Sequence, residues 1–266
     1  MSKNQNYVFC IDSDGCAMDT MTYKHQLFFG PLAVRIFEIR NGDEFLKKWD
    51  NINLYSRTRG VNRFVGLVMA LEESGIQNID RLKQWISRST SLSNDSLKEE
   101  ITKNASDDLT KALAWSNAVN QHIRDYEGQT LSFKGVREGL AVLHELGNVY
   151  VVSSANKEAV QDEWIEQGLI HYADDLYCQD RGKKEDIIAE LIHQGYQPDK
   201  IMMVGDSPGD LDAAEQNQVV FFPILVGKEM ESWQCLKERV AKAFTQNNLS
   251  KKEVDNWKQE FWENLD

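Results

Sequence analysis

Polar residues that could do chemistry stand at the ends of short apolar runs of this chain. They are Asp12, Asp14, Ser153, Lys183, Lys184, Asp206 and Asp210. Because ligands of open α/β sheets bind at the carboxyl ends of the strands, we expect these side chains to meet at one edge of a sheet. Carboxylates that meet in this way can bind a divalent cation, and a hydroxyl and a lysine can bind anionic oxygens.

Taken one at a time, the same residues have ordinary structural explanations. An Asp-x-Asp spacing arises by chance in so acidic a chain, so Asp12 and Asp14 could be turn or helix-capping residues. Ser153 could be a helix N-cap, and Lys184 could be a solvated surface charge. The glycines of residues 205–210 would also suit any tight turn from a strand to a helix. The aspartate pair, Ser153, the lysine and residues 205–210 follow one another along the chain, each after an apolar run. This order favours one common site over four unrelated structural roles.

The apolar runs have the length and composition of buried strands. They span residues 7–11, 149–152, 175–178, 201–204 and 219–222. The stretches between the later runs place apolar residues at helical spacing, as at Val136, Leu140 and Leu143. Strands that alternate with helices indicate a parallel sheet covered on both faces. The predicted fold class is therefore α/β, with a doubly wound, Rossmann-like parallel sheet.

The segment between the first two runs has a different pattern. Apolar residues recur there at helical spacing, and no run alternates as a strand would. Ser106, followed by two aspartates, is typical of a helix start, and Ser74 with Gly75 is typical of a helix end. We expect an inserted all-helical cap domain at residues 16–133, and an α/β core made of residues 1–15 and 134–266.

The C-terminal tail from Lys228 onward is rich in tryptophan. Trp233, Trp257 and Trp262 have spacings that suit packing of a helix onto the core. The sequence suggests no chemistry for this tail.

The composition narrows the class of protein. The chain has 30 lysines and arginines against 42 aspartates and glutamates, a formal net charge of -12, which disfavours nucleic-acid and anionic-membrane partners. No apolar run approaches the ~18 residues needed to span a bilayer, and no signal sequence is evident. The four cysteines form no CxxC pair and are typical of reduced thiols. We expect a soluble cytoplasmic protein, and the oligomeric state stays open.

The order of these motifs resembles that of the haloacid dehalogenase superfamily. The resemblance covers residues 7–14 and about 133–225, and the run MVGDSPGD at residues 203–210 is very similar to the fourth motif of that family. It implies a Mg2+-dependent phosphatase that hydrolyses a small phosphorylated metabolite. The reaction would pass through an aspartyl-phosphate intermediate.

The resemblance also implies a role for each residue of the predicted site. Asp12 would be the nucleophile, and Asp14 would be the general acid and base. Ser153 and Lys184 would bind the oxygens of the phosphoryl group. The residues implied for Mg2+ are Asp12, Asp14 through its backbone carbonyl, Asp206, and Asp210 as an orienting group. The cation and the lysine would offset the repulsion between an attacking carboxylate and a phosphate dianion.

Three features depart from the pattern of the family. Cys16 stands where a threonine is usual, and Ala17 and Met18 replace more typical aliphatic residues. No proline follows the lysine, so either Lys183 or Lys184 could be the motif lysine. We favour Lys184 because it opens the amphipathic helix that follows.

Other activities of the same superfamily are alternatives. Dehalogenases lack the second aspartate, and phosphonate-cleaving members alter that position, so Asp14 argues against both. A phosphomutase keeps all four motifs and stays open. A catalytically silent binding or regulatory protein is a further alternative. It is disfavoured by four intact residues, Asp12, Asp14, Lys184 and Asp206.

The predicted cap contains one arginine-rich segment, residues 56–63. Arg57, Arg59 and Arg63 lie there just before an amphipathic helix. They could bind a second anionic group of the substrate, because arginine presents a rigid fork to carboxylate or phosphate oxygens. The more common outcome for such a segment is a solvated loop whose arginines pair with surface acids.

Overall fold

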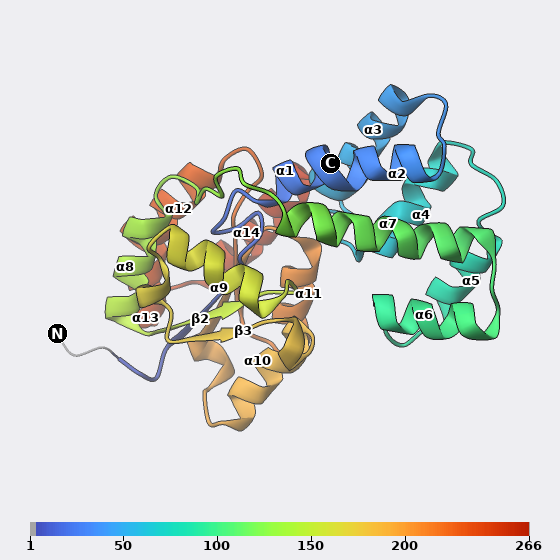
Figure 1. The fold of residues 1–266 in the computed structure, drawn as a ribbon. Helices are drawn as coiled ribbons and strands as arrows, with labels where there is room; N and C mark the ends of the chain where they lie inside the picture. The colour runs from blue at the N-terminus through green and yellow to red at the C-terminus, as the bar shows by residue number, and fades with distance from the viewer. Residues whose placement is uncertain (1–3, 266) are drawn as a thin grey trace. The chain divides into compact units, whose positions relative to one another are not determined.

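The computed structural model describes residues 4–265 and contains a five-stranded parallel sheet (Figure 1). The strands are β1 (Val8–Ile11), β2 (Asn148–Val152), β3 (Asp175–Tyr177), β4 (Ile201–Gly205) and β5 (Val220–Pro223), in the order β3-β2-β1-β4-β5. Each predicted strand is confirmed, with bounds that differ by no more than one residue at either end.

Helices occupy most of the remaining described chain. The α-helices are α1 (Met21–Tyr23), α2 (Gly30–Ile36), α3 (Gly42–Asp50), α4 (Arg63–Glu73), α5 (Asp80–Arg88), α6 (Asn94–Lys103), α7 (Asp107–Arg124), α8 (Val136–Leu146), α9 (Lys157–Glu166), α10 (Lys184–His193), α11 (Pro208–Gln216), α12 (Glu229–Cys235), α13 (Ala241–Thr245) and α14 (Lys251–Asn264). Shorter π- or 3-10-helical segments are η1 (Lys24–Phe29), η2 (Asn51–Tyr55), η3 (Ile170–Tyr172), η4 (Gln179–Arg181), η5 (Pro198–Lys200) and η6 (Leu236–Val240). Ser106 is the N-cap of α7, and α4 ends before Ser74 and Gly75, as the sequence predicts.

The sheet is buried on both faces. Successive side chains of each strand point to opposite sides, and an apolar cluster lies on each side. On β1, Phe9 and Ile11 join the apolar cluster that includes residues of α8, α9 and α12. Val8 and Cys10 join the cluster on the other face, with residues of α10, α11 and α14. This two-sided coverage is the reason that the strands are nearly continuous apolar runs, and it confirms the doubly wound fold class.

Strand β1 lies at the centre of the sheet and fixes the register of its neighbours. Ile11 pairs with Val151 of β2 and with Val204 of β4, and both pairs are parallel. The three strands therefore end within one residue of the same level. The segments that follow them begin at the same edge of the sheet.

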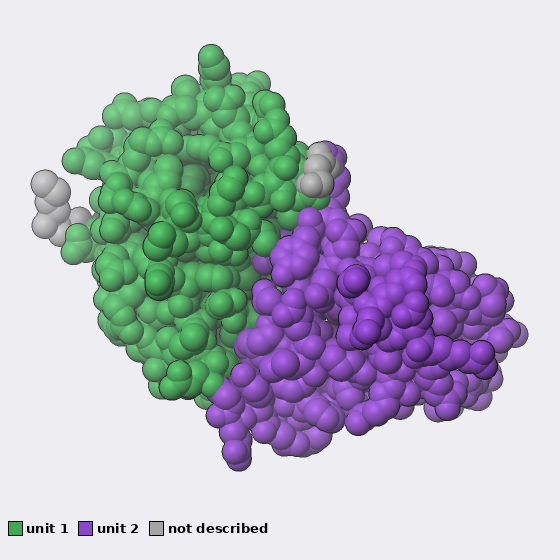
Figure 2. All heavy atoms as spheres, turned by 90° about the horizontal axis from the view of Figure 1, so that it is seen from above, with its two compact units in different colours: residues 1–21, 129–266 green, residues 22–128 purple. Residues whose placement is uncertain are grey.

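The chain divides into two compact units, coloured separately in Figure 2. One unit comprises residues 1–21 and 129–266 and contains the sheet, and we call it the core unit. The other comprises residues 22–128, is entirely helical in its regular structure, and is called the helical unit. An inserted helical domain agrees with the predicted fold class, whereas its predicted bounds of 16 and 133 stay a prediction.

The helical unit has an aromatic interior of its own. Its largest buried side chains are Phe45, Trp49, Phe64, Trp85 and Trp115. The ring of Trp49 meets that of Trp115 edge to face at 5.9 Å, and the indole nitrogen of Trp115 donates to the carbonyl of Phe29 at 2.9 Å. Burying large aromatic side chains removes much apolar surface from water, so this cluster can hold the helices together without a sheet.

The sequence predicts reduced thiols and no membrane-spanning segment, and both bear on the compartment of the protein. All four cysteines are free. Among the described residues, no helix combines the length and the apolar character that a bilayer span requires. A cytoplasmic location stays a prediction.

Candidate active site

Asp12 is the first residue after β1 and is 5% exposed. Its backbone N–H donates to the carbonyl of Val204 at 3.0 Å, which holds the end of β1 against β4. Its Oδ1 accepts from the backbone N–H of Ser13 at 2.8 Å. Oδ1 also takes an ion pair with Lys184, whereas Oδ2 accepts no hydrogen bond from any residue that the structure describes. One oxygen of Asp12 is thus held, and the other is left for a further partner.

Lys184, the first residue of α10, lies between two carboxylates. Its Nζ is 2.8 Å from Oδ1 of Asp12 and 2.6 Å from Oδ1 of Asp210. The side chain is only 10% exposed, so the alternative of a solvated surface charge is wrong for this residue. Lys183 has a side chain that is 72% exposed and lies 3.7 Å from Glu185. Of the two lysines, Lys184 is therefore the one that reaches the carboxylates.

Three buried carboxylates gather at this edge of the sheet. Asp12, Asp206 and Asp210 each offer an oxygen within 4.8 Å of the others. Asp206 and Asp210 are 1% and 0% exposed. This donor set, all oxygen and all anionic, fits a hard divalent cation such as Mg2+. Sequence reasoning predicted all three residues, and the fold brings them together.

Asp210 is held on both of its oxygens by the chain itself. Oδ1 accepts from Lys184 at 2.6 Å, and Oδ2 accepts from the backbone N–H of Ser207 at 3.0 Å and from its hydroxyl at 2.7 Å. Ser207 and Asp210 form a capping box at the start of α11. The segment is therefore both a strand-to-helix turn and part of the carboxylate cluster, so the two interpretations of the segment do not exclude each other.

Gly205 makes the close approach of Asp210 possible. A Cβ at position 205 would lie 2.3 Å from Cγ of Asp210 and 2.4 Å from its Oδ2. Contacts this short are excluded by van der Waals repulsion, and the capped carboxylate has little freedom to move away. A glycine is required here for packing against Asp210.

Asp14 stands apart from the three clustered carboxylates. Its side chain is partly exposed, and its Oδ1 accepts from the hydroxyl of Thr20. Thr20 is not among the residues predicted for the site, because no spacing rule marks a hydroxyl six residues along the chain. The metal role predicted for Asp14 involves its backbone carbonyl, so the position of the carboxylate does not test it.

Ser153 follows β2 and is 2% exposed. Its Oγ accepts from the backbone N–H of Ala155 at 3.1 Å. The N-cap of α9 is Asn156, whose Oδ1 accepts from Ala159, so the alternative that Ser153 caps this helix is wrong. Strand β2 is the neighbour of β1, so Ser153 and Asp12 follow adjacent strands. Contact with a phosphoryl group stays a prediction for Ser153.

Burial and charge act together on Asp12 and Lys184. Burial raises the pKa of Asp12, Lys184 opposes this rise, and the carboxylates of Asp210 and Asp206 add to it. Burial disfavours the charged form of Lys184, but Asp12 and Asp210 outweigh it and raise the pKa of this lysine above its usual value. Lys184 is therefore a cation at neutral pH.

Two arginines of residues 56–63, Arg59 and Arg63, make hydrogen bonds within the helical unit. Arg59 is 3% exposed and donates to the carbonyl of Leu54 at 2.6 Å. Arg63 donates to Asn120 at 2.7 Å, and its guanidinium lies 5.1 Å from the ring centroid of Phe29. The solvated-loop alternative is therefore wrong for Arg59 and Arg63. A contact with substrate stays a prediction.

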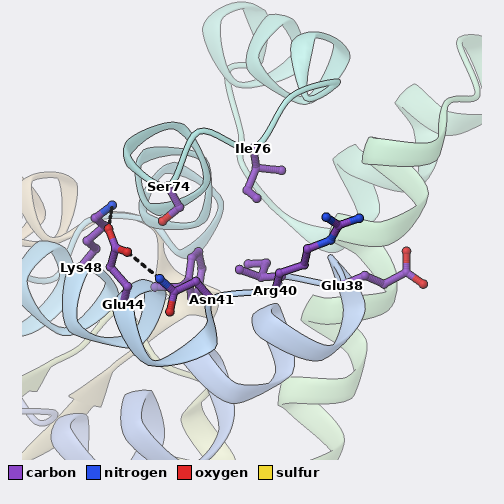
Figure 3. Close-up of a pocket in the computed structure, with 9 residues that line it drawn as sticks. Glu38, Arg40, Asn41, Glu44, Lys48, Ser74 and Ile76 are labelled. Carbon is purple, nitrogen blue, oxygen red and sulfur yellow. Dashed lines mark hydrogen bonds and ion pairs between the residues drawn. The ribbon is translucent and has the colours of Figure 1, made fainter.

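A cavity of about 330 Å3 lies within the helical unit (Figure 3). Its polar lining includes Arg40, Asn41, Glu44 and Lys48, and Glu44 accepts from both Asn41 and Lys48. The charge of Lys48 is thus matched by that of Glu44. None of the predicted site residues lines this cavity, so we do not assign the chemistry to it.

Comparison with known proteins agrees with the motif pattern. The family model described as "Hydrolase: haloacid dehalogenase-like hydrolase" matches residues 8–217. This range includes β1 to β4 and every residue of the predicted site. No curated protein matches the chain in sequence.

Solved structures share the fold at low identity. One, which carries the name of a phosphoglycolate phosphatase from Lactobacillus delbrueckii subsp. bulgaricus, has a TM-score of 0.55 and 18% identity, over 94% of this chain and 100% of that one. A predicted phosphoglycolate phosphatase from Haemophilus somnus has a TM-score of 0.51 and 14% identity, over 82% of this chain and 84% of that one. At these identities the likeness shows the fold alone.

Proposed function

The chain belongs to the haloacid dehalogenase-like hydrolases, and we propose that within this family it is a Mg2+-dependent phosphatase acting on a small phosphate monoester. The observation that carries the proposal is the buried cluster of Asp12, Asp206 and Asp210, with Lys184 between Asp12 and Asp210. Three carboxylates buried this close together repel one another, and Lys184 contacts Asp12 and Asp210. A divalent cation bound by these oxygens would offset that repulsion and that of an incoming phosphoryl group.

We propose Asp12 as the nucleophile. Its Oδ1 is held by Ser13 and Lys184, which fixes the direction of the carboxylate and leaves Oδ2 for attack on phosphorus. In-line attack forms a bond from Asp12 to phosphorus and breaks the bond from phosphorus to the ester oxygen. The product of this step is an aspartyl-phosphate, which water then hydrolyses to inorganic phosphate.

Asp14 is proposed as the group that moves the protons. It would give a proton to the leaving alcohol in the first step and take one from the attacking water in the second. Two observations support this role. Asp14 lies two residues after the nucleophile on the same loop, and its partly exposed carboxylate is outside the charged cluster.

Ser153 and Lys184 are proposed to bind the phosphoryl oxygens. Lys184 already lies at Asp12, so an oxygen of the phosphoryl group would meet it as the group reaches the nucleophile. Asp206 and Asp12, with the backbone carbonyl of Asp14, would hold Mg2+, and Asp210 would orient them through its own fixed contacts. When bound, the cation offsets the charge of the phosphate and of the attacking carboxylate.

Hydrolysis of a generic aryl phosphate tests the proposal. We expect release of inorganic phosphate with Mg2+ and none in excess chelator, with activity restored when Mg2+ is returned. Ca2+ should inhibit, because it prefers more ligands and a looser coordination shell. Full activity in excess chelator would contradict the metal requirement.

The same assay separates the alternatives. A phosphomutase would convert a phosphorylated sugar into an isomer with little release of inorganic phosphate. A catalytically silent binding protein would hydrolyse nothing in a panel of sugar phosphates, nucleotides and phosphorylated acids, although it would still bind one of them. The phosphatase proposal expects at least one member of the panel to be hydrolysed well above the aryl phosphate.

A further inference from the structure

Two buried tryptophans donate hydrogen bonds to the loop that follows Asp12. Trp164 of α9 donates from its indole nitrogen to the hydroxyl of Ser13 at 3.0 Å. Trp233 of α12 donates from its indole nitrogen to the backbone carbonyl of Cys16 at 2.9 Å. Both indoles are 0% exposed. The two contacts lie on either side of Asp14 in the chain.

The loop is also held by backbone hydrogen bonds, from Gly15 N–H to the carbonyl of Met18 at 2.8 Å and from Phe133 N–H to the carbonyl of Ala17 at 3.1 Å. The carbonyl of Ser13 accepts from the backbone N–H groups of Ala17 and Met18 at 3.0 and 2.8 Å, which folds the loop back on itself. The thiol of Cys16 donates to the carbonyl of Val204 at 3.5 Å, and burial followed by the nearby carboxylates raises its pKa, so it stays protonated. The indole donors connect this folded loop to helices outside it.

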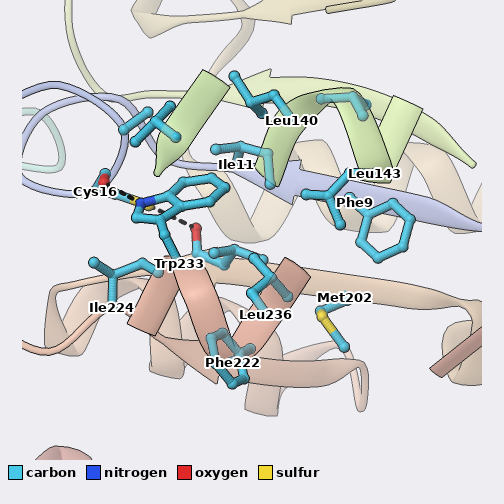
Figure 4. Packing of buried hydrophobic residues seen from close by; sticks show 14 of the residues in the cluster. Phe9, Ile11, Cys16, Leu140, Leu143, Met202, Phe222, Ile224, Trp233 and Leu236 are labelled. Atoms are coloured by element: carbon cyan, nitrogen blue, oxygen red, sulfur yellow. Dashed lines mark hydrogen bonds between the residues drawn. The ribbon is translucent and has the colours of Figure 1, made fainter. Parts of the chain in front are cut away.

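The side chain of Trp233 fits a space shaped for it. Figure 4 shows its indole among Ile11, Leu140 and Leu236, with the ring nitrogen directed at Cys16. A Cβ on Gly139 of α8 would lie 2.5 Å from Cε3 of the indole. The absence of a side chain at Gly139 therefore lets the indole lie against α8. This packing gives the ring little freedom to rotate away from the loop.

We propose that Trp164 and Trp233 are positioning residues that hold the loop from Ser13 to Cys16 in the conformation from which Asp12 and Asp14 act. Neither is assigned contact with substrate or metal. The inference rests on the proposed function for the roles of the two aspartates. Trp233 lies beyond residues 8–217 that match the family model, so a C-terminal segment outside that match would support the reacting groups.

A fixed loop matters because phosphoryl transfer requires its reacting groups to be held in a precise position. Buried donors facing a loop carbonyl and hydroxyl are costly to leave unpaired, so each indole penalises departures of the loop from this conformation. Small displacements of a nucleophile or of a general acid lower the rate of the chemical step more than they lower binding.

The test compares three tryptophan-to-phenylalanine variants. Trp164→Phe and Trp233→Phe keep an aromatic ring and remove the N–H donor. Trp257→Phe is the matched control, because Trp257 is also buried in the core unit but packs against Phe222, at 5.1 Å between ring centroids. We expect kcat for an aryl phosphate to fall about three- to tenfold in the first two variants, the range covered by loss of one neutral hydrogen bond. KM should change by less than about twofold.

Hydrogen–deuterium exchange of the whole protein gives a second readout that needs no activity. Peptides covering residues 12–18 should exchange faster in Trp164→Phe and Trp233→Phe and at the wild-type rate in Trp257→Phe. If Trp233→Phe does not fold, Gly139→Ala replaces it. That change keeps the donor but displaces the ring, and we expect the same fall in kcat and the same faster exchange.

Two results would overturn the inference. One is unchanged kcat and unchanged loop exchange in the folded variants. The other is an equal effect of Trp257→Phe, which would mark a general loss of packing. If the wild type proves not to be a phosphatase, the proposed function fails, and loop exchange by itself still decides whether the indoles hold the loop.

Discussion

The core unit and the helical unit bury charge in different ways. In the core unit, Asp12, Asp206 and Asp210 lie within one small region, and Lys184 lies between Asp12 and Asp210. In the helical unit the buried polar groups are dispersed. Asp108 accepts from the backbone N–H of Leu82, and Arg59 donates to a backbone carbonyl.

This difference indicates which unit is built for chemistry. Isolated buried charges that are matched by backbone groups at helix ends or in loops serve the fold and leave nothing to react. A cluster of like charges costs stability, and it persists where a ligand or cation compensates it. We therefore expect substitutions in the core cluster to remove activity, and substitutions in the helical unit to act on stability or on substrate choice.

The largest expected effect is that of Asp12→Asn. An amide cannot form the acyl-phosphate, so turnover should fall more than about 100-fold while the melting temperature stays close to that of the wild type. Asp212→Asn is the matched control, since Asp212 belongs to the second Asp-x-Asp of the chain but is exposed on α11. Steady-state kinetics with an aryl phosphate measures both variants. More than a few per cent of wild-type turnover in Asp12→Asn would contradict the covalent role.

The second-largest loss of activity is expected at Gly205, where the absence of a side chain leaves room for Asp210. Gly205→Ala should lower kcat at least about tenfold, because the new methyl group would displace the carboxylate that Lys184 and Ser207 hold. Gly209→Ala alters the same motif, but a Cβ there would meet only the hydroxyl of Ser207 at 3.7 Å, and its activity should be unchanged. Equal activity of the two variants would show that the fixed position of Asp210 does not matter.

A smaller effect is expected in the helical unit. Arg63→Ala removes the donors to Ser116 and Asn120 and the contact with Phe29, so the unit should lose about 1–3 kcal/mol of stability. Hydrolysis of an aryl phosphate well below the melting temperature should be nearly unchanged. Calorimetry and kinetics on Arg63→Ala and on the exposed neighbour Arg57→Ala measure this. A higher KM for a substrate with a second anionic group, without a change in melting, would instead support the substrate role predicted from the sequence.

The smallest expected effect is on the metal-free protein. Asp206→Ala relieves repulsion with Asp12 and Asp210, so in excess chelator it should melt at the wild-type temperature or slightly above it. Stabilisation by added Mg2+ should be lost in this variant, because a ligand that binds the folded state stabilises it only where it can bind. A clear fall in the melting temperature in chelator would show that Asp206 stabilises the fold rather than the metal site.

Local features of the fold could be predicted because each depends on residues that are close together in the sequence. The strands are recognisable as short apolar runs, since a sheet covered on both faces buries every residue of a strand. The C-terminal end of α4 and the start of α7 could be predicted from Ser74, Gly75 and Ser106, since helix termini depend on groups within one turn. The strand-end rule then predicted which side chains would share one edge.

Contacts between distant parts of the chain were decided only by the tertiary structure. Either lysine could have been the partner of Asp12, and the start of α10 directs Lys184 inward while Lys183 is exposed. Trp233 was predicted to pack on the core, but its donor role toward Cys16 joins residues 217 positions apart. Such contacts depend on the register of the whole sheet and on the packing of helices across it. The sequence by itself therefore determined the elements and their reactive ends, while the packed core decided which atoms meet.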